Sequence, residues 1–108
     1  MDYNVSPGSG TDYQADSVGD GMLEHNRAYL DWIDGIHRRY PHVILENCSS
    51  GGMREDYAQT SRFQVQSTSD QQDFRLYPVI AAAAPMMVLP EQAASWAYPQ
   101  SDMGAEET

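Results

Sequence analysis

Residues 42–52 read His-Val-Ile-Leu-Glu-Asn-Cys-Ser-Ser-Gly-Gly, and this stretch decides the fold that we expect. Its first part, up to Cys48, is a short run of β-branched and apolar residues, which is typical of a strand buried on both faces of a parallel sheet. Its second part is polar and ends in Gly51 and Gly52, where the backbone can turn tightly and approach a ligand closely. The stretch therefore predicts a buried strand that carries a polar, glycine-rich loop at its carboxyl end.

Upstream of this strand the sequence predicts a loop followed by a long helix. Residues 5–21 are rich in Gly, Ser, Asp and Pro, which favour turns. From residue 22 to residue 40 apolar side chains recur at three- and four-residue steps, with Asp20 placed to cap the helix and Pro41 placed to end it. Asp2-Tyr3-Asn4 is typical of the end of a further strand.

Downstream of residue 52 the alternation continues. We expect a helical turn over 53–60, a strand over 63–68 and a helix over 73–84 that ends at Pro85, whereas residues 86–99 show no clear period. Strands that alternate with helices indicate an α/β fold with parallel strands. A closed (β/α)₈ barrel needs roughly 200 residues or more, so the 108 residues are interpreted as a piece of such a barrel.

Composition excludes several functions. The chain carries 16 acidic and 6 basic residues, a net charge of −10, and all six basic residues are arginines. Without lysine there is no Schiff base and no Walker-type phosphate contact, and so acidic a surface repels nucleic acid and anionic membranes. Cys48, the single cysteine, cannot form an intrachain disulfide. Since the sequence also shows neither a membrane span nor a signal-like N-terminus, we expect a cytoplasmic protein without nucleic-acid or membrane partners.

Polar residues follow the predicted strands at residues 2–4, 46–52 and 69–70, and neighbouring parallel strands would bring these ends together. Two carboxylates that flank a bond, one attacking and one donating a proton, can split a glycoside with retention of configuration. Asp2 and Asp70 are the candidates for this pair.

These residues also have ordinary structural interpretations. Asp70 can cap the helix that follows it, and Cys48 can be a small buried residue. Trp32 and Trp96 are more typical of a core than of a platform for sugars. The histidines lie on or beside the long helix, where exposure is the rule, so the sequence predicts no metal site.

Four motifs in order resemble the C-terminal part of the catalytic barrel of glycoside hydrolase family 36, which is dominated by α-galactosidases. They are Asp2-Tyr3-Asn4, Gly-Met-Leu-Glu-His-Asn at 21–26, Glu-Asn-Cys-Ser-Ser-Gly-Gly-Met-Arg-Glu-Asp at 46–56, and Ser-Asp-Gln-Gln-Asp at 69–73. The resemblance extends to about Pro99, and residues 100–108 form a tail. It implies a partial (β/α)₈ barrel that contributes about the last three βα units.

The resemblance also implies roles for single residues. Asp2 matches the catalytic nucleophile of the family and Asp70 its general acid/base. Asn4 matches the Asn of the first motif, while Cys48 and Gly51 match the loop that closes on galactose. The implied substrate is a terminal α-galactoside, no metal or organic cofactor is needed, and a homo-oligomeric parent enzyme stays open.

The sequence departs from the family upstream of Asp2, because the Lys that the family carries two positions before its nucleophile has no counterpart. We therefore expect the isolated chain to be inactive and to expose a strand edge. We expect Arg54 to pair with a carboxylate such as Asp56. The alternatives are an α-N-acetylgalactosaminidase, a galactosyl transferase of the raffinose-synthase type, a non-catalytic sugar-binding or assembly module, and a small acidic α/β domain without chemistry.

Overall fold

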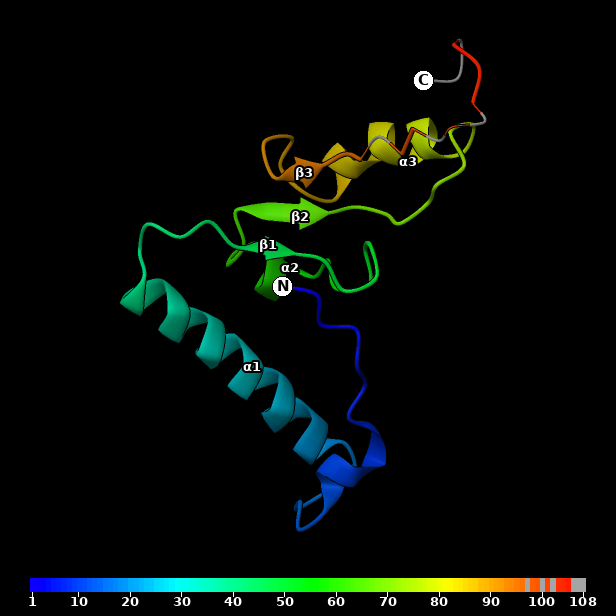
Figure 1. The fold of residues 1–108 in the computed structure, drawn as a ribbon. Helices are drawn as coiled ribbons and strands as arrows, with labels where there is room; N and C mark the ends of the chain where they lie inside the picture. The colour runs from blue at the N-terminus through cyan, green and yellow to red at the C-terminus, as the bar shows by residue number, and fades with distance from the viewer. Residues whose placement is uncertain (97, 100, 102, 106–108) are drawn as a thin grey trace. The chain divides into compact units, whose positions relative to one another are not determined.

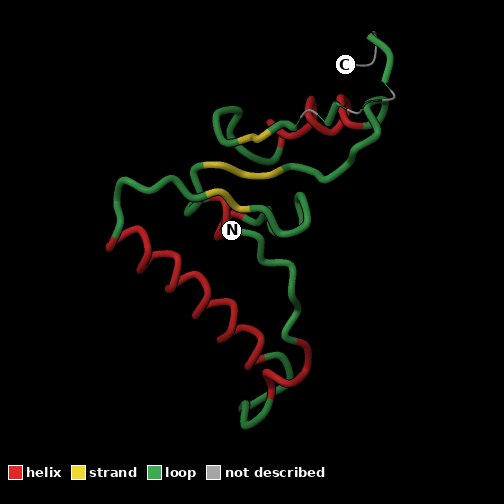
Figure 2. The backbone as a smooth tube through the Cα atoms, in the orientation of Figure 1, coloured by secondary structure: helices red, strands yellow, loops and turns green. Residues whose placement is uncertain are grey.

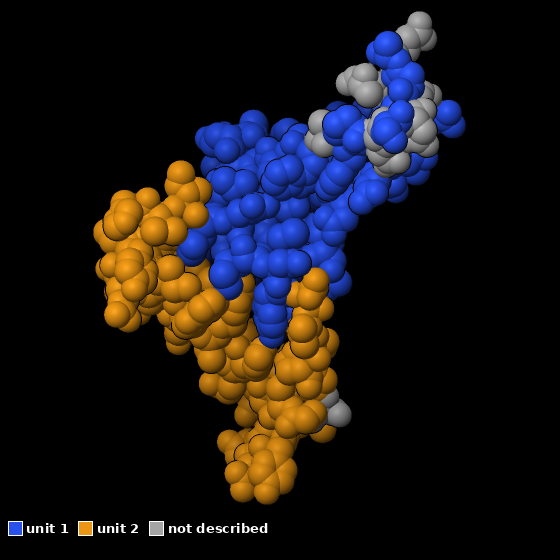
Figure 3. All heavy atoms as spheres, in the orientation of Figure 1, with its two compact units in different colours: residues 1–3, 45–108 blue, residues 4–44 orange. Residues whose placement is uncertain are grey.

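A computed structural model of the chain describes residues 1–96, 98–99, 101 and 103–105. The chain divides into two units, one formed by residues 1–3 and 45–108 and the other by residues 4–44 (Figure 3). The first unit contains the strands, and the second contains the long helix (Figure 1).

The helices and strands follow one another along the chain in the order η1 (Gly8–Asp12), α1 (Asp20–Arg39), β1 (Glu46–Asn47), α2 (Tyr57–Thr60), β2 (Val65–Ser67), α3 (Tyr77–Ala83), η2 (Ala84–Met86) and β3 (Ala93–Ala94). Each of the first two strands is followed by a helix that leads to the next strand. The predicted α/β alternation is therefore confirmed. None of the described helices is both long enough and apolar enough to cross a lipid bilayer.

The strands form one parallel sheet in the order β1-β2-β3 (Figure 2). In this sheet Asn47 lies opposite Gln66. Met1 extends this pattern on the free edge of β1. Its amino group donates to the Glu46 carbonyl at 2.6 Å, and its own carbonyl accepts from the Cys48 N–H at 2.8 Å. This exchange is the hydrogen-bond pattern of a parallel pair, so Met1 lies beside β1 and Asp2 follows directly. Residues 1–4 nevertheless form no strand, so the strand predicted to end there is limited to this one pairing.

The long helix of the second unit is confirmed, with a difference at its start. Gly19 occupies the N-cap position in a left-handed conformation, and Asp20 is the first helical residue. The prediction that Asp20 caps the helix is therefore wrong by one position. Its carboxylate still lies in the first turn, where the partial positive charge of the helix favours an acid. The loop expected over residues 5–21 contains the short helix η1.

The strand expected over residues 42–48 is shorter than predicted. Ile44 is 71% exposed, and regular pairing covers only β1. The Leu45 N–H donates to the side-chain oxygen of Gln64 at 2.9 Å instead of to a neighbouring strand. The apolar residues before Glu46 therefore do not lengthen β1, because the Leu45 N–H is taken by a side chain and not by the backbone of a neighbouring strand.

The helix expected over residues 73–84 also begins later. Asp73 makes a local turn, since its carboxylate accepts the N–H of Arg75 at 2.8 Å and its carbonyl accepts the N–H of Leu76 at 3.0 Å. This turn delays α3 to residue 77, and Pro78 then fits its first turn. Pro85 lies inside η2, so the helical path does not end at this residue as expected.

Few apolar side chains are buried within the described residues. Phe63 and Val88 are buried in the first unit and Ile33 in the second. Trp32 is 53% exposed and Trp96 is 38% exposed, so the interpretation of both as core residues is wrong.

Candidate active site

The loop after β1, residues 48–52, forms the centre of the candidate site. Ser49, Ser50 and Gly51 have positive φ angles of 60°, 52° and 75°. Two consecutive non-glycine residues in the left-handed region cost free energy, about 1–2 kcal/mol each, and such strain gathers at functional sites. The loop therefore holds an unfavourable backbone shape that the surrounding contacts impose.

On one side this loop meets Asp2. The Ser50 N–H lies 3.4 Å from Oδ1 of Asp2, which accepts this hydrogen bond. Asp2 itself is exposed. The backbone amide of the loop thus faces the carboxylate that the sequence selects as nucleophile.

On its other side the loop packs against the segment after β2. A Cβ atom added to Gly51 would lie 2.7 Å from the Asp70 nitrogen and 2.9 Å from the Ser69 Cα, both backbone atoms. Any side chain at Gly51 would therefore collide with the strand end that carries Asp70. The loop brings the segments of both predicted catalytic carboxylates into contact with itself.

The Asp70 carboxylate is exposed, and it does not cap the following helix. Leu76 occupies the N-cap position of α3, six positions further on, without a side-chain hydrogen bond to the helix. The ordinary interpretation of Asp70 as a helix cap is therefore wrong. This result removes the competing structural role but does not itself assign a chemical one.

Arg54 fixes the segment that carries Asp2. Its Nε donates to the Tyr3 carbonyl at 2.9 Å, and its guanidinium lies over the Tyr3 ring, 4.3 Å from the ring centre. Asp56, the partner expected for Arg54, caps α2 instead, because its carboxylate accepts the N–H groups of Ala58 and Gln59. Sequence reasoning missed this role of Arg54, since it depends on a segment 51 residues away.

A buried polar layer lies beneath the loop. The Asn47 amide donates to Gln66 at 2.8 Å and to the Arg54 carbonyl at 2.6 Å, and Asn47, Gln66 and Ser49 are all fully buried. Within the described part of the chain, Asn47 Oδ1 and Ser49 Oγ have no hydrogen-bond partner. An unpaired buried polar atom costs about 1–3 kcal/mol, so these two atoms lower the stability of the layer.

The remaining predicted residues differ in position. Cys48 is half-buried, carries a free thiol and begins the loop, so it lies in the same unit as Asp2 and Asp70. Asn4 is exposed and belongs to the unit formed by residues 4–44. The structure thus gathers Asp2, Cys48, Gly51 and Asp70 in one unit.

Three aromatic residues form what we call the aromatic cluster: Tyr77 at the start of α3, and Trp96 and Tyr98 shortly after β3. The Trp96 N–H donates to the Tyr77 hydroxyl at 2.6 Å, and the rings of Tyr77 and Tyr98 meet edge to face with 6.2 Å between centroids. Burial, followed by the nearby charges of Asp70, Tyr77 and Cys48, raises the pKa of the Tyr98 phenol. Its link to Asp70 and Cys48 was not predicted, because residues 86–99 carry no periodic signal.

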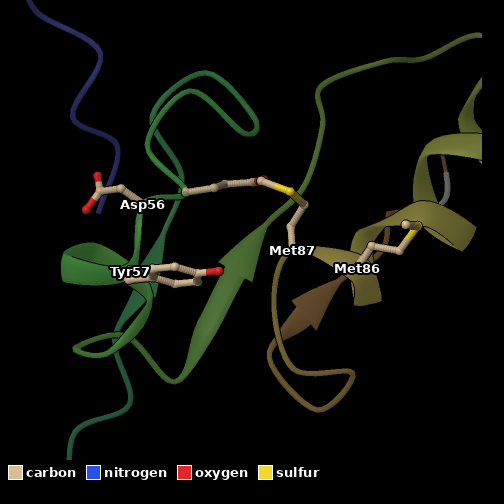
Figure 4. A pocket seen from close by; sticks show the side chains of 5 residues that line it. Asp56, Tyr57, Met86 and Met87 are labelled. Carbon is tan, nitrogen blue, oxygen red and sulfur yellow. The ribbon is translucent and has the colours of Figure 1, made fainter.

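Two hollows lie elsewhere in the same unit. Asp56, Tyr57, Met86 and Met87 line one of about 350 Å³ together with Glu55 (Figure 4). Glu55 also lines the second, of about 320 Å³, and burial raises its pKa. Neither Asp2 nor Asp70 borders these hollows, so they are separate from the candidate site. No metal-binding group of His, Cys, Asp and Glu is found among the described residues.

Comparisons with protein-family models, with curated proteins and with solved structures find no match to the chain.

Proposed function

We propose that this chain forms the C-terminal part of the (β/α)₈ catalytic barrel of a retaining α-galactosidase of glycoside hydrolase family 36. Asp2 acts as the nucleophile and Asp70 as the general acid/base. The observation that carries the proposal is that one strained loop, residues 48–52, contacts the Asp2 carboxylate on one side and the Asp70 backbone on the other. The parallel order of the strands is the second support.

The spacing of the strands suits this chemistry. The Met1 segment and β2 lie on opposite edges of β1, so their backbones are about 10 Å apart, twice the usual strand spacing. Asp2 and Asp70 come shortly after these two outer segments, so their side chains start from backbones with one strand between them. Retaining glycosidases use carboxyl groups about 5–5.5 Å apart.

The reaction proceeds in two displacements. The Asp2 carboxylate attacks the anomeric carbon while protonated Asp70 gives its proton to the leaving oxygen, so the glycosidic bond breaks and a galactosyl ester forms on Asp2. Water then attacks the same carbon, Asp70 takes its proton, and galactose leaves with its original configuration. Gly51 lets the loop pack closely against the backbone of the segment that carries Asp70.

Release of nitrophenol from 4-nitrophenyl α-galactoside tests the proposal. The assay compares a complete barrel that contains residues 1–108 with the chain alone. In the complete barrel we expect Asp2→Asn and Asp70→Asn each to lower kcat at least about 100-fold, since each removes a reacting group. The exposed Asp31→Asn variant on α1 is the matched control and should retain activity.

The outcomes separate the alternatives. Full activity in both Asn variants overturns the assigned roles. Preference for the N-acetylgalactosamine analogue identifies the α-N-acetylgalactosaminidase alternative, and transfer of galactose to sucrose in place of water identifies the transferase. Galactoside binding without any turnover supports a sugar-binding module instead.

A further inference from the structure

The aromatic cluster has no part in the two-carboxylate mechanism, although hydrogen bonds fix the position of Trp96 within it. Besides its bond to Tyr77, Trp96 donates through its indole Nε1 to Ser67 Oγ at 3.2 Å, which ties the cluster to the end of β2. Trp96 is nevertheless 38% exposed. An indole ring whose N–H is already hydrogen-bonded and whose face is exposed can pack against the apolar face of a ligand.

The position of the cluster follows from the strand order. Along the carboxyl edge of the sheet, Asp2 comes first, the 48–52 loop second, the segment of Asp70 third and the segment after β3 fourth. Thr68 Oγ1 donates to the Ala94 carbonyl at 2.9 Å and thereby fastens the third segment to the fourth. The segment that carries Trp96 and Tyr98 therefore lies beside the segment that carries Asp70.

The charges in this region agree with that position. The carboxylate of Asp70 acts on the Tyr98 phenol and contributes to its raised pKa, after the larger effect of burial. The phenol consequently keeps its proton at neutral pH and can donate a hydrogen bond. A protonated phenol and an indole beside a carboxylate suit a neutral, hydroxyl-rich ligand and repel an anionic one.

A general acid stands at the leaving oxygen, so whatever lies beyond Asp70 faces the leaving group. On this basis, which rests on the proposed function, we propose that Tyr98 and Trp96, supported by Tyr77, form the subsite for the leaving group. The leaving group that this subsite takes is a second sugar ring, whose C–H face packs on the aromatic rings while the phenol donates to a hydroxyl group.

The first test compares two substrates that differ only in the leaving group. Melibiose carries a sugar ring there, whereas α-galactosyl fluoride carries none. In a complete barrel that contains the chain, we expect Tyr98→Ala to lower kcat/KM for melibiose at least tenfold more than kcat/KM for the fluoride. Tyr98→Phe keeps the ring and should retain most of this selectivity. Tyr13→Ala, an exposed tyrosine outside the cluster, is the matched control and should change neither value.

Equal losses on both substrates, or no loss on either, would overturn the subsite while leaving the proposed hydrolysis intact. A second measurement does not depend on turnover. The chain has two tryptophans, so its NMR spectrum has two indole N–H signals, which a Trp32→Phe variant assigns. Melibiose should shift the Trp96 signal more than methyl α-galactoside does, and Tyr98→Ala should abolish that difference. A Trp96 shift together with no hydrolysis by the complete barrel would refute the proposed function and keep the subsite, whereas equal shifts by both sugars would refute the subsite.

Discussion

Gly51→Ala is the substitution that probes the candidate site most sharply. The new Cβ would lie 2.7 Å from the Asp70 nitrogen, and the residue has a φ of +75°, so the variant meets both a collision and an unfavourable conformation. The left-handed conformation costs about 1–2 kcal/mol for a residue with a Cβ, and overpacking against backbone adds about 1–3 kcal/mol. We expect a total loss of about 2–5 kcal/mol in the free energy of unfolding.

Gly8→Ala separates the two contributions. Gly8 has a similar φ of +67°, but no atom lies within 4 Å of its added Cβ, so this control carries the conformational cost alone. Urea unfolding of both variants measures the difference. If the chain relieves the collision by moving Asp70 by about 1 Å, hydrolysis in the complete barrel should fall about 100-fold in Gly51→Ala. Equal destabilisation by the two substitutions would refute the close packing of the loop against Asp70.

Three further predictions follow from contacts of the first unit. Arg54→Met removes the hydrogen bond to the Tyr3 carbonyl, so residues 1–3 should exchange their amide hydrogens faster in NMR spectra, which Arg75→Met should not cause. Asp56→Ala removes the cap of α2 and should cost about 1 kcal/mol in urea unfolding, whereas Asp56→Asn should recover most of it. Burial raises the pKa of Glu55, so the folded state binds its proton more tightly than the unfolded state, and stability falls as pH rises through the carboxyl range. Glu55→Gln should therefore raise the Tm at pH 7 and lose this advantage near pH 3.5; a lower Tm at pH 7 would contradict the sign.

The alternation of elements could be predicted from sequence because it depends on local patterns. The repeat of apolar residues identifies α1 without reference to the rest of the chain, whereas the β-branched run before Cys48 only indicates that a strand lies nearby, since β1 covers Glu46–Asn47. β3 consists of two alanines and has no such pattern. β3 forms only because the folded chain brings Ala93 opposite Gln66 of β2, and a pairing between such distant residues leaves no local pattern in the sequence.

The candidate site also combines features that a local sequence pattern predicts with features that depend on distant contacts. Asp2 and Asp70 were identified because acidic residues at strand ends are visible in a sequence. The left-handed conformations of Ser49 and Ser50 were not, since serine rarely adopts positive φ. The close approach of Gly51 to Asp70 was not either, because it joins residues 19 positions apart. The contribution of Tyr98 depends on a similar long-range approach to Asp70.

The roles of the two carboxylates are tested most directly by azide rescue in a complete barrel that contains the chain, with 2,4-dinitrophenyl α-galactoside as substrate. In Asp70→Gly the galactosyl ester on Asp2 still forms, and azide attacks it, so we expect α-galactosyl azide. In Asp2→Gly no ester forms, and azide displaces the leaving group directly to give β-galactosyl azide. The same anomer from both variants, or no galactosyl azide from either, would contradict the assignment of Asp2 as nucleophile and Asp70 as acid/base.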